Sequence, residues 1–326
     1  MPEKITIVQA LNMALKQEME RDDKVIILGE DVGKDGGVFR VTEGLYQKFG
    51  ADRVVDTPLA ESAIVGTSIG MAAYGLRPVA EIQFDGFIHG AMEQLVSHAA
   101  RIRTRSRGRF TCPMVLRAPY SGGIHAPEHH SESMEALYIH TPGLKVVIPS
   151  TPYDSKGLLI SSIRDPDPVI FLEPKKIYRS VKQEVPEEVY AIPLGKANKV
   201  LEGTDVTLIS WGAMMRPTLE AAELAKSQGM VCEVIDMRTL YPFDQEAILN
   251  SVNKTGRVVI VQEAPRTCGF ASEIAAIIAE KSLLNLEAPV ERVTGFDTIM
   301  PLYKLENDYL PDSFRVLKAI EKVVKF

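Results

Sequence analysis

Short apolar segments alternate with longer amphipathic segments through the first half of the chain. Apolar residues recur at helical spacing between Ile7 and Met19, and Thr6 precedes them in a position to cap a helix. Apolar runs that fit strands occupy residues 25–28, 53–56, 79–83, 114–117, 145–148 and 169–172, with helical stretches between them at 61–74, 87–102, 134–140 and 154–163. This alternation predicts a parallel sheet that is covered by helices on both faces.

The pattern stops at residues 174–200 and then resumes. This stretch contains Pro174, Pro186, Pro193 and a charged run at 183–188, which together indicate a linker. Beyond it, strands are predicted at 206–210, 231–236, 258–262 and 289–293, and helices at 217–228, 245–251, 272–280 and 312–324. We therefore expect an α/β protein of two doubly wound domains, residues 1–180 and 201–326, joined by a linker at 181–200.

Composition narrows the class of protein. The 326 residues include 37 Lys+Arg and 43 Asp+Glu, a formal net charge of −6, which argues against a general nucleic-acid binder. No apolar run approaches the length of a membrane span, and the N-terminus lacks the layout of a signal peptide. Cys112, Cys232 and Cys268 lie too far apart for a disulfide framework or a metal-binding pair. We expect a cytoplasmic protein without a nucleic-acid or membrane partner.

The usual nucleotide-binding signatures are absent from the sequence. No predicted strand leads into a G-x-G-x-x-G motif, and no phosphate-binding G-x-x-x-x-G-K-[ST] loop occurs. Gly66, Gly70 and Gly75 lie in the predicted helix after residue 60, where small residues permit close packing, and we expect that helix to be deeply buried. A nucleotide-dependent dehydrogenase or kinase is therefore disfavoured.

Glu61 follows a predicted strand and a Thr57-Pro58 turn, a position where ligands of open α/β sheets gather. The apolar neighbours Leu59 and Ile64 would desolvate its carboxyl, whereas the nearby helix N-terminus would favour the charged form. The alternative is a first-turn glutamate that only satisfies free helix amides. Both interpretations stay open on spacing alone.

The segment 121–131 reads SGGIHAPEHHS and holds His125, His129 and His130, half of the six histidines in the chain. A zinc site would need an H-x-x-x-H helix or a nearby cysteine pair, and neither is present. General acid–base chemistry by one histidine fits a glycine-rich loop better. Histidines that simply bond the loop backbone remain the alternative.

Five arginines occupy alternate positions between Arg101 and Arg109. The net charge and the lack of interleaved aromatic residues favour a helix end or subunit interface over nucleic-acid binding.

The later turn Asp165-Pro166-Asp167-Pro168 could direct backbone carbonyl groups at a monovalent cation, although such a turn also forms without an ion.

Several motifs together resemble one family. They are GEDVG at 29–33, DTPLAES at 56–62, EIQF at 81–84, GLKVVIPS at 143–150, PVIFLE at 168–173 and DMRTLYP at 236–242. In this order they are similar to the beta subunit of the thiamine-diphosphate-dependent 2-oxo acid dehydrogenase component, of the pyruvate and branched-chain types. The resemblance spans essentially the whole chain and implies a transketolase-like pyrimidine-binding domain followed by a transketolase C-terminal-type domain.

The resemblance also implies roles for particular residues. Glu61 matches the glutamate that hydrogen-bonds the aminopyrimidine ring, and Phe84 and Phe87 match a segment that packs near that ring. His130 aligns with the active-site histidine of an H-S-x-S segment, although a one-residue shift would select His129. A structural potassium ion in relatives is held at positions matching Met114, Ser162, Ile163, Asp165 and Asp167, largely through backbone carbonyls.

One expected motif is missing. Thiamine-diphosphate proteins hold Mg²⁺ and the diphosphate with a G-D-G motif, and this sequence has none. The resemblance therefore implies that an alpha subunit supplies those ligands in an alpha2-beta2 heterotetramer, with a dihydrolipoyl acyltransferase core as a further partner. We expect oxidative decarboxylation of a small 2-oxo acid with reductive acylation of lipoyl groups. An acetoin dehydrogenase beta subunit and a non-catalytic docking subunit are the alternatives.

Overall fold

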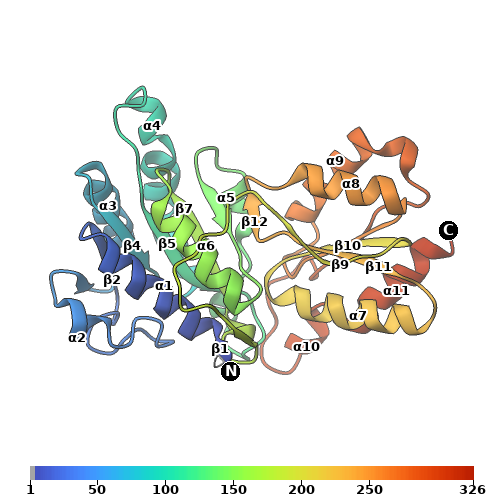
Figure 1. Ribbon diagram of the computed structural model, residues 1–326, viewed down its shortest axis with the longest axis horizontal. Coiled ribbons are helices and arrows are strands. Elements are labelled where there is room, and N and C mark those ends of the chain that lie inside the picture. Colours follow the sequence, from blue (N-terminus) through green and yellow to red (C-terminus); the bar gives the residue numbers. More distant parts are fainter. Residues whose placement is uncertain (1–3) are drawn as a thin grey trace.

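Residues 4–326 are described here from a computed structural model. They form one sheet of seven strands, one sheet of five strands and a two-stranded ribbon. Figure 1 shows the two larger sheets side by side, each flanked by its own helices. The predicted α/β class with two wound sheets is confirmed.

The first sheet is parallel except for one edge strand. In sheet order its strands are β12 (Thr239–Tyr241), β6 (Lys145–Val147), β7 (Val169–Pro174), β5 (Val115–Tyr120), β4 (Arg77–Glu81), β2 (Val25–Gly29) and β3 (Val54–Asp56). The edge strand β12 runs antiparallel to β6 and comes from the second half of the chain. The two halves of the sequence therefore share this sheet, which the sequence pattern did not predict.

Alternate residues of the first sheet face two separate apolar cores. Val25 and Ile27 of β2 join one cluster with helices α1 (Ile7–Arg21) and α6 (Pro152–Arg164), whereas Leu28 joins the other. The second cluster contains residues of α3 (Glu61–Ala73) and α5 (Glu135–Ile139). Thr6 caps α1 through a reciprocal capping box with Gln9, as its position predicts.

The second sheet is also parallel except for one edge strand. Its order is β14 (Glu291–Val293), β13 (Val258–Val261), β10 (Val206–Ser210), β11 (Cys232–Asp236) and β9 (Asn198–Leu201), with only β9 antiparallel. Helices α7 (Met215–Ser227) and α11 (Ser313–Val324) lie on one face, and α8 (Gln245–Thr255) and α9 (Phe270–Lys281) lie on the other (Figure 1). Short helices α2 (Leu45–Phe49) and α10 (Glu306–Tyr309) lie in connecting segments. Between residues 4 and 326, no helix is long and apolar enough to cross a membrane.

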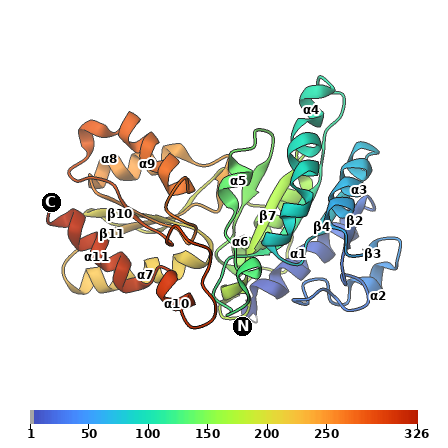
Figure 2. The ribbon, with the colours of Figure 1, turned by 180° about the vertical axis from the view of Figure 1, so that it is seen from behind.

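Two helical predictions need correction. The segment predicted as one helix at 87–102 is irregular. Along the chain it consists of the 3-10 segment η1 (Asp85–Ala91), the π-helical η2 (Gln94–His98), the 3-10 turn η3 (Ala99–Arg101) and the short helix α4 (Ile102–Arg105). Helix α4 projects at the top of Figure 2. At the start of this segment the backbone of Gly86 lies close to the neighbouring loop, since a Cβ on Gly86 would lie 2.2 Å from the His129 carbonyl oxygen. Helix α3 is not deeply buried either, since its Ala63, Thr67 and Gly70 face is exposed.

The segment predicted as a linker is fastened to the first unit. Strand β8 (Lys182–Glu184) pairs with β1 (Lys4–Thr6), and the buried Lys156 ammonium donates to the carbonyls of Pro186, Glu187 and Glu188. Polar exposed strands such as β8 carry no hydrophobic alternation, so sequence pattern does not detect them. The domain limits at 180 and 201 remain predictions.

One buried ion network ties the centre of the first sheet together. Arg117 of β5 is 1% exposed, and its guanidinium contacts Glu173 of β7 at 2.6 Å and Glu81 of β4 at 2.7 Å. The Tyr178 hydroxyl donates to the second oxygen of Glu173 at 2.5 Å. Burial raises the pKa of Glu81, and the adjacent Arg117 charge opposes that rise. Both carboxylates depend on one guanidinium for charge compensation.

We expect Arg117→Met to lower the free energy of unfolding by about 3–5 kcal/mol, because it leaves two buried carboxylates without a counter-charge. Chemical denaturation followed by circular dichroism measures the change. Arg216→Met is the matched control, because Arg216 is 62% exposed beside Glu220 and should contribute less than about 1 kcal/mol. Equal losses in the two variants would contradict this account.

Candidate active site

The predicted site residues lie at one edge of the first sheet. Strands β3, β2, β4 and β5 are parallel neighbours, so their carboxyl ends meet at that edge. Glu61 follows β3, Phe84 follows β4, and the loop 121–133 that carries His130 follows β5. Glu30, which the sequence analysis did not single out, follows β2 and is buried. Topology thus brings together residues that are far apart in the sequence.

Glu61 is the first residue of α3 and is half-buried. Of the two apolar neighbours expected to desolvate it, Leu59 is 77% exposed and Ile64 is buried. Burial raises the pKa of Glu30, and the nearby Glu61 charge raises it further. Two carboxyl groups therefore lie near one another at the carboxyl edge of the sheet.

Aromatic rings line the site beside these carboxyl groups. The Phe84 ring lies 5.6 Å from Phe87 and 5.6 Å from Phe39, both in edge-to-face geometry. The His130 imidazole packs edge-on against Phe84 at 4.4 Å and against Phe87 at 5.0 Å. The structure thus brings Phe84, Phe87 and His130 into one cluster.

His129 and His130 differ in their surroundings. His129 has a half-exposed side chain whose Nδ1 lies 3.2 Å from Glu132, which also contacts His89 at 3.3 Å. His130 Nδ1 is buried without a hydrogen-bond partner in the described residues. Burial lowers the pKa of His130, and the charges of His129 and Lys175 lower it further. His130 is therefore held neutral to lower pH than a free histidine, with one nitrogen available to a ligand.

Lys175 is a buried cation that the sequence analysis missed. It is 4% exposed, donates to the Ser121 carbonyl, and its ammonium lies 5.9 Å from the centre of the Phe84 ring. Burial lowers its pKa to about 8, while nearby Glu263 and Asp85 oppose the shift. Lysine side chains are usually exposed, so nothing in the sequence marks this one as buried.

The positions matched to a potassium site also come together. Cys112 N donates to the Pro166 carbonyl at 3.1 Å and Val169 N donates to the Met114 carbonyl at 3.0 Å, which joins the start of β5 to the turn before β7. These contacts place Met114, Ser162, Ile163, Asp165 and Asp167 at one end of the first unit. Arg77 already donates to the Ile163 carbonyl at 2.9 Å, and Lys145 pairs with the Asp165 carboxylate at 2.7 Å. The positively charged side chains of Arg77 and Lys145 thus lie at this end of the first unit.

The remaining sequence candidates have ordinary roles in this chain. Arg103 from the arginine run pairs with Asp167 at 2.6 Å, beside α4. Among residues 4–326, no group of three or more histidine, cysteine, aspartate or glutamate side chains could hold a metal ion. In the same part of the chain Cys112, Cys232 and Cys268 are free thiols, the first two buried.

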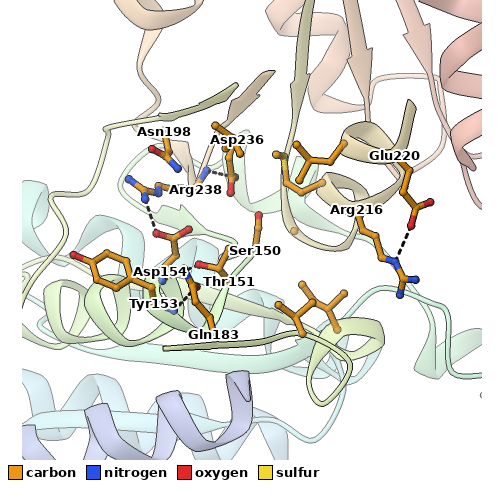
Figure 3. A pocket seen from close by; sticks show the side chains of 16 residues that line it. Ser150, Thr151, Tyr153, Asp154, Gln183, Asn198, Arg216, Glu220, Asp236 and Arg238 are labelled. Carbon is orange, nitrogen blue, oxygen red and sulfur yellow. Dashed lines mark hydrogen bonds and ion pairs between the residues drawn. The ribbon is translucent and has the colours of Figure 1, made fainter. Parts of the chain in front are cut away.

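A separate pocket of about 510 Å³ lies where the two units meet (Figure 3). Asp154 at the start of α6 pairs with the Arg238 guanidinium at 2.6 Å, and Asp236 accepts from the Arg238 backbone N–H at 3.1 Å. Burial raises the pKa of Asp236 to about 7, and the Asp154 charge adds to the shift. These ionic contacts join α6 of the first unit to the end of β11 in the second.

Comparison with known proteins agrees with this architecture. The family description "Transketolase, pyrimidine binding domain" matches residues 3–181, and "Transketolase, C-terminal domain" matches residues 195–316. The chain is 54% identical to the pyruvate dehydrogenase E1 component subunit beta of Acholeplasma laidlawii, over 98% of each chain. The corresponding subunit of Bacillus subtilis (strain 168) is 51% identical, over 99% of each.

The chain belongs to the family of pyruvate dehydrogenase E1 component beta subunits. The family resemblance inferred from the sequence motifs is therefore confirmed, as is the 2-oxo acid dehydrogenase type. A solved structure described as a split gene transketolase, an inactive beta4 tetramer, has a TM-score of 0.82 over 99% of each chain. At 22% identity it shows the transketolase fold alone.

We expect Lys175→Met to raise the pKa of His130. At pH 5–7 the Lys175 ammonium is charged, since its pKa is about 8, and it disfavours a second positive charge on His130. Removing it should move protonation of His130 to higher pH. Titration of the imidazole ring proton by nuclear magnetic resonance measures the midpoint, and Lys182→Met on exposed β8 is the control. An unchanged midpoint in Lys175→Met would refute the assigned cause.

Proposed function

We propose that this chain is the beta subunit of a pyruvate dehydrogenase E1 component, which decarboxylates pyruvate and reductively acylates lipoyl groups. The observation that carries the proposal is the placement of Glu61, Phe84 and His130 at one open sheet edge. Relatives with the name pyruvate dehydrogenase E1 component subunit beta, more than half identical over nearly the full chain, support pyruvate as the substrate.

The residues at this edge fit the pyrimidine half of thiamine diphosphate. Phe84 and Phe87 offer aromatic surface beside a half-buried carboxyl group, and His130 Nδ1 lacks a partner among the described residues. A polar atom left unpaired in a buried position is costly unless a ligand or water satisfies it. When bound, thiamine diphosphate supplies an electron sink for decarboxylation.

The residues of this chain would then have distinct tasks. The Glu61 carboxyl accepts or shares a proton with a ring nitrogen of the cofactor, and the exposed edge leaves room for that ring. Phe84 and Phe87 provide apolar surface that excludes water and orients the ring. His130 stays neutral near pH 7 because its pKa is lowered, so its imidazole can orient the substrate and move a proton during acyl transfer.

The site is half of an active site, and an alpha subunit supplies the rest. The absence of G-D-G from the sequence leaves Mg²⁺ and the diphosphate without ligands in this chain. The exposed small-residue face of α3, next to the 77% exposed Leu59, fits a close contact with another subunit. We propose an alpha2-beta2 heterotetramer, active only when assembled. A dihydrolipoyl acyltransferase core would bind near the C-terminal helix α11, where Phe326 is 80% exposed.

The proposal also includes a potassium ion, an alternative substrate and a cytoplasmic location. A potassium ion would use the free lone pairs of the carbonyls around Met114, Ser162 and Ile163, next to the carboxylates of Asp165 and Asp167. Branched-chain 2-oxo acids are the alternative substrates with which pyruvate must be compared. Free thiols at all three cysteines are consistent with a reducing, cytoplasmic setting.

We expect Glu61→Gln in the assembled alpha–beta complex to lower the rate of decarboxylation by at least about 100-fold, because an amide cannot exchange a proton with the cofactor. Single-turnover release of carbon dioxide measures the rate. Glu223→Gln, an exposed position on α7, is the control. A near-wild-type rate in the Glu61 variant would favour a docking subunit without a catalytic role.

Substrate preference is tested by co-expressing the chain with its alpha subunit and assaying pyruvate, branched-chain 2-oxo acids and acetoin. We expect the highest kcat/KM for pyruvate. One or two methylene groups change binding in an apolar pocket by about 1–3 kcal/mol, so preferences of about 10- to 100-fold are expected. A preference for a branched-chain acid or for acetoin would overturn the pyruvate assignment and leave the decarboxylase or cleavage chemistry intact.

A further inference from the structure

The loop 121–133 is closed at its base and strained within. Ser121 N donates to the Glu132 carbonyl at 3.0 Å, which joins the two ends of the loop. Ser121 has a φ of 75° and His125 a φ of 58°, values that residues other than glycine rarely adopt. Such conformations persist only where surrounding contacts enforce them. The position of His130 therefore depends on whatever holds this loop.

A carboxylate from the second unit holds both ends of the loop. Glu263 lies two residues after the end of β13, is 2% exposed, and belongs to the second sheet's carboxyl edge. Its Oε1 accepts from the Gly122 backbone N–H at 2.5 Å and from the Ser133 hydroxyl at 3.3 Å. The same oxygen therefore bonds the residues on either side of the loop's closing contact. The Lys175 ammonium bonds the Ser121 carbonyl from the first unit.

Other groups of the second unit contact the same loop. Glu306 of α10 is fully buried and lies 3.6 Å from His125 Nδ1, while the Tyr303 ring lies 4.6 Å from the His125 ring. The terminal methyl of Met300 also approaches the loop, since a Cβ on Gly122 would lie 2.7 Å from it. The loop is thus enclosed by the second unit along one side. Glu263 is the member of this set that bonds its backbone directly.

We propose that Glu263 is a positioning residue for His130, through which the second unit holds the 121–133 loop in its active conformation. The inference rests on the proposed role of His130. Glu263 is 2% exposed and its Oε1 is engaged by Gly122 and Ser133, so we expect it to act on the site through the loop, whereas its Oε2 has no hydrogen-bond partner among the described residues. Both contacts donate to the carboxylate, so a glutamine at this position retains an acceptor oxygen for them, and an alanine does not.

The test compares Glu263→Ala and Glu263→Gln in the assembled alpha–beta complex. Hydrogen exchange of peptides covering 121–133 reports the loop, and steady-state kinetics reports the reaction. We expect Glu263→Ala to increase exchange in the loop by about 10-fold or more and to lower kcat by a similar factor, with a smaller change in KM. Glu263→Gln should restore most of both losses.

Glu233→Ala is the matched control. Glu233 is also a buried carboxylate of the second unit, 1% exposed on β11 and paired with Lys254, but it contacts neither end of the loop. It should leave exchange in 121–133 unchanged. If Glu263→Ala prevents assembly, Ser133→Ala removes one of the two bonds and should increase loop exchange to a smaller extent.

Three outcomes would overturn the inference: unchanged loop exchange in Glu263→Ala, increased exchange with unchanged kcat, or a glutamine variant no better than alanine. His130→Gln separates this failure from failure of the proposed function. Full activity in His130→Gln would remove the role of His130 itself. Unchanged loop exchange in Glu263→Ala, together with an inactive His130→Gln, would leave the role of His130 intact and reject only the positioning role of Glu263.

Discussion

The burial of one guanidinium between two carboxylates is the constraint on which the first unit depends. Glu81 at the end of β4 is the register partner of Arg117 in the middle of β5, and Glu173 of β7 lies two residues beyond the residue that pairs with Arg117, so the three side chains come together on one face of the sheet. Glu81 and Glu173 would repel one another there without Arg117, whose contacts at 2.6 and 2.7 Å compensate both. The bidentate fork of an arginine suits this task better than a lysine would.

The aromatic face of the site is built on this network. Tyr178 donates to Glu173, its ring lies 5.3 Å from Phe39, and Phe39 in turn meets Phe84 at 5.6 Å. His130 rests on Phe84. A continuous path of contacts therefore leads from the buried charges to the imidazole. Under the catalytic role proposed for His130, such a path matters because a catalytic group misplaced by about 1 Å loses much of its effect.

Periodicity and capping predicted the regular elements well. Strand β10 begins and ends where the apolar run does, at Val206 and Ser210, and the helix predicted at 312–324 is α11 (Ser313–Val324), for which Asp312 is the N-cap. Glu61 follows the end of β3, as the predicted strand at 53–56 and its turn indicate, whereas Phe84 was singled out by the family resemblance and lies just beyond β4. These features are encoded locally, in the period of apolar residues and in the residues that start a helix.

Non-local features could not be predicted in this way. Strand β12 has three residues and joins the first sheet only because the second unit folds against it. The irregular turns between residues 85 and 105 are not revealed by the apolar spacing, which predicts a regular helix there. The sequence around Lys175 and Glu263 gives no sign that these charged residues are buried. Their burial beside the His130 loop depends on contact between the two units.

The second unit therefore takes part in the site of the first. It completes the first sheet through β12, pairs Arg238 with Asp154 across the pocket, and bonds the histidine loop through Glu263. Each of these contacts is lost if the two units separate. Because buried charges without partners are costly, such separation would expose or strand Asp154, Lys175 and Glu263 together. Strand pairing, shared apolar clusters and buried charges thus all hold the two units together, and the contact of Glu263 with the loop links that arrangement to the position of His130.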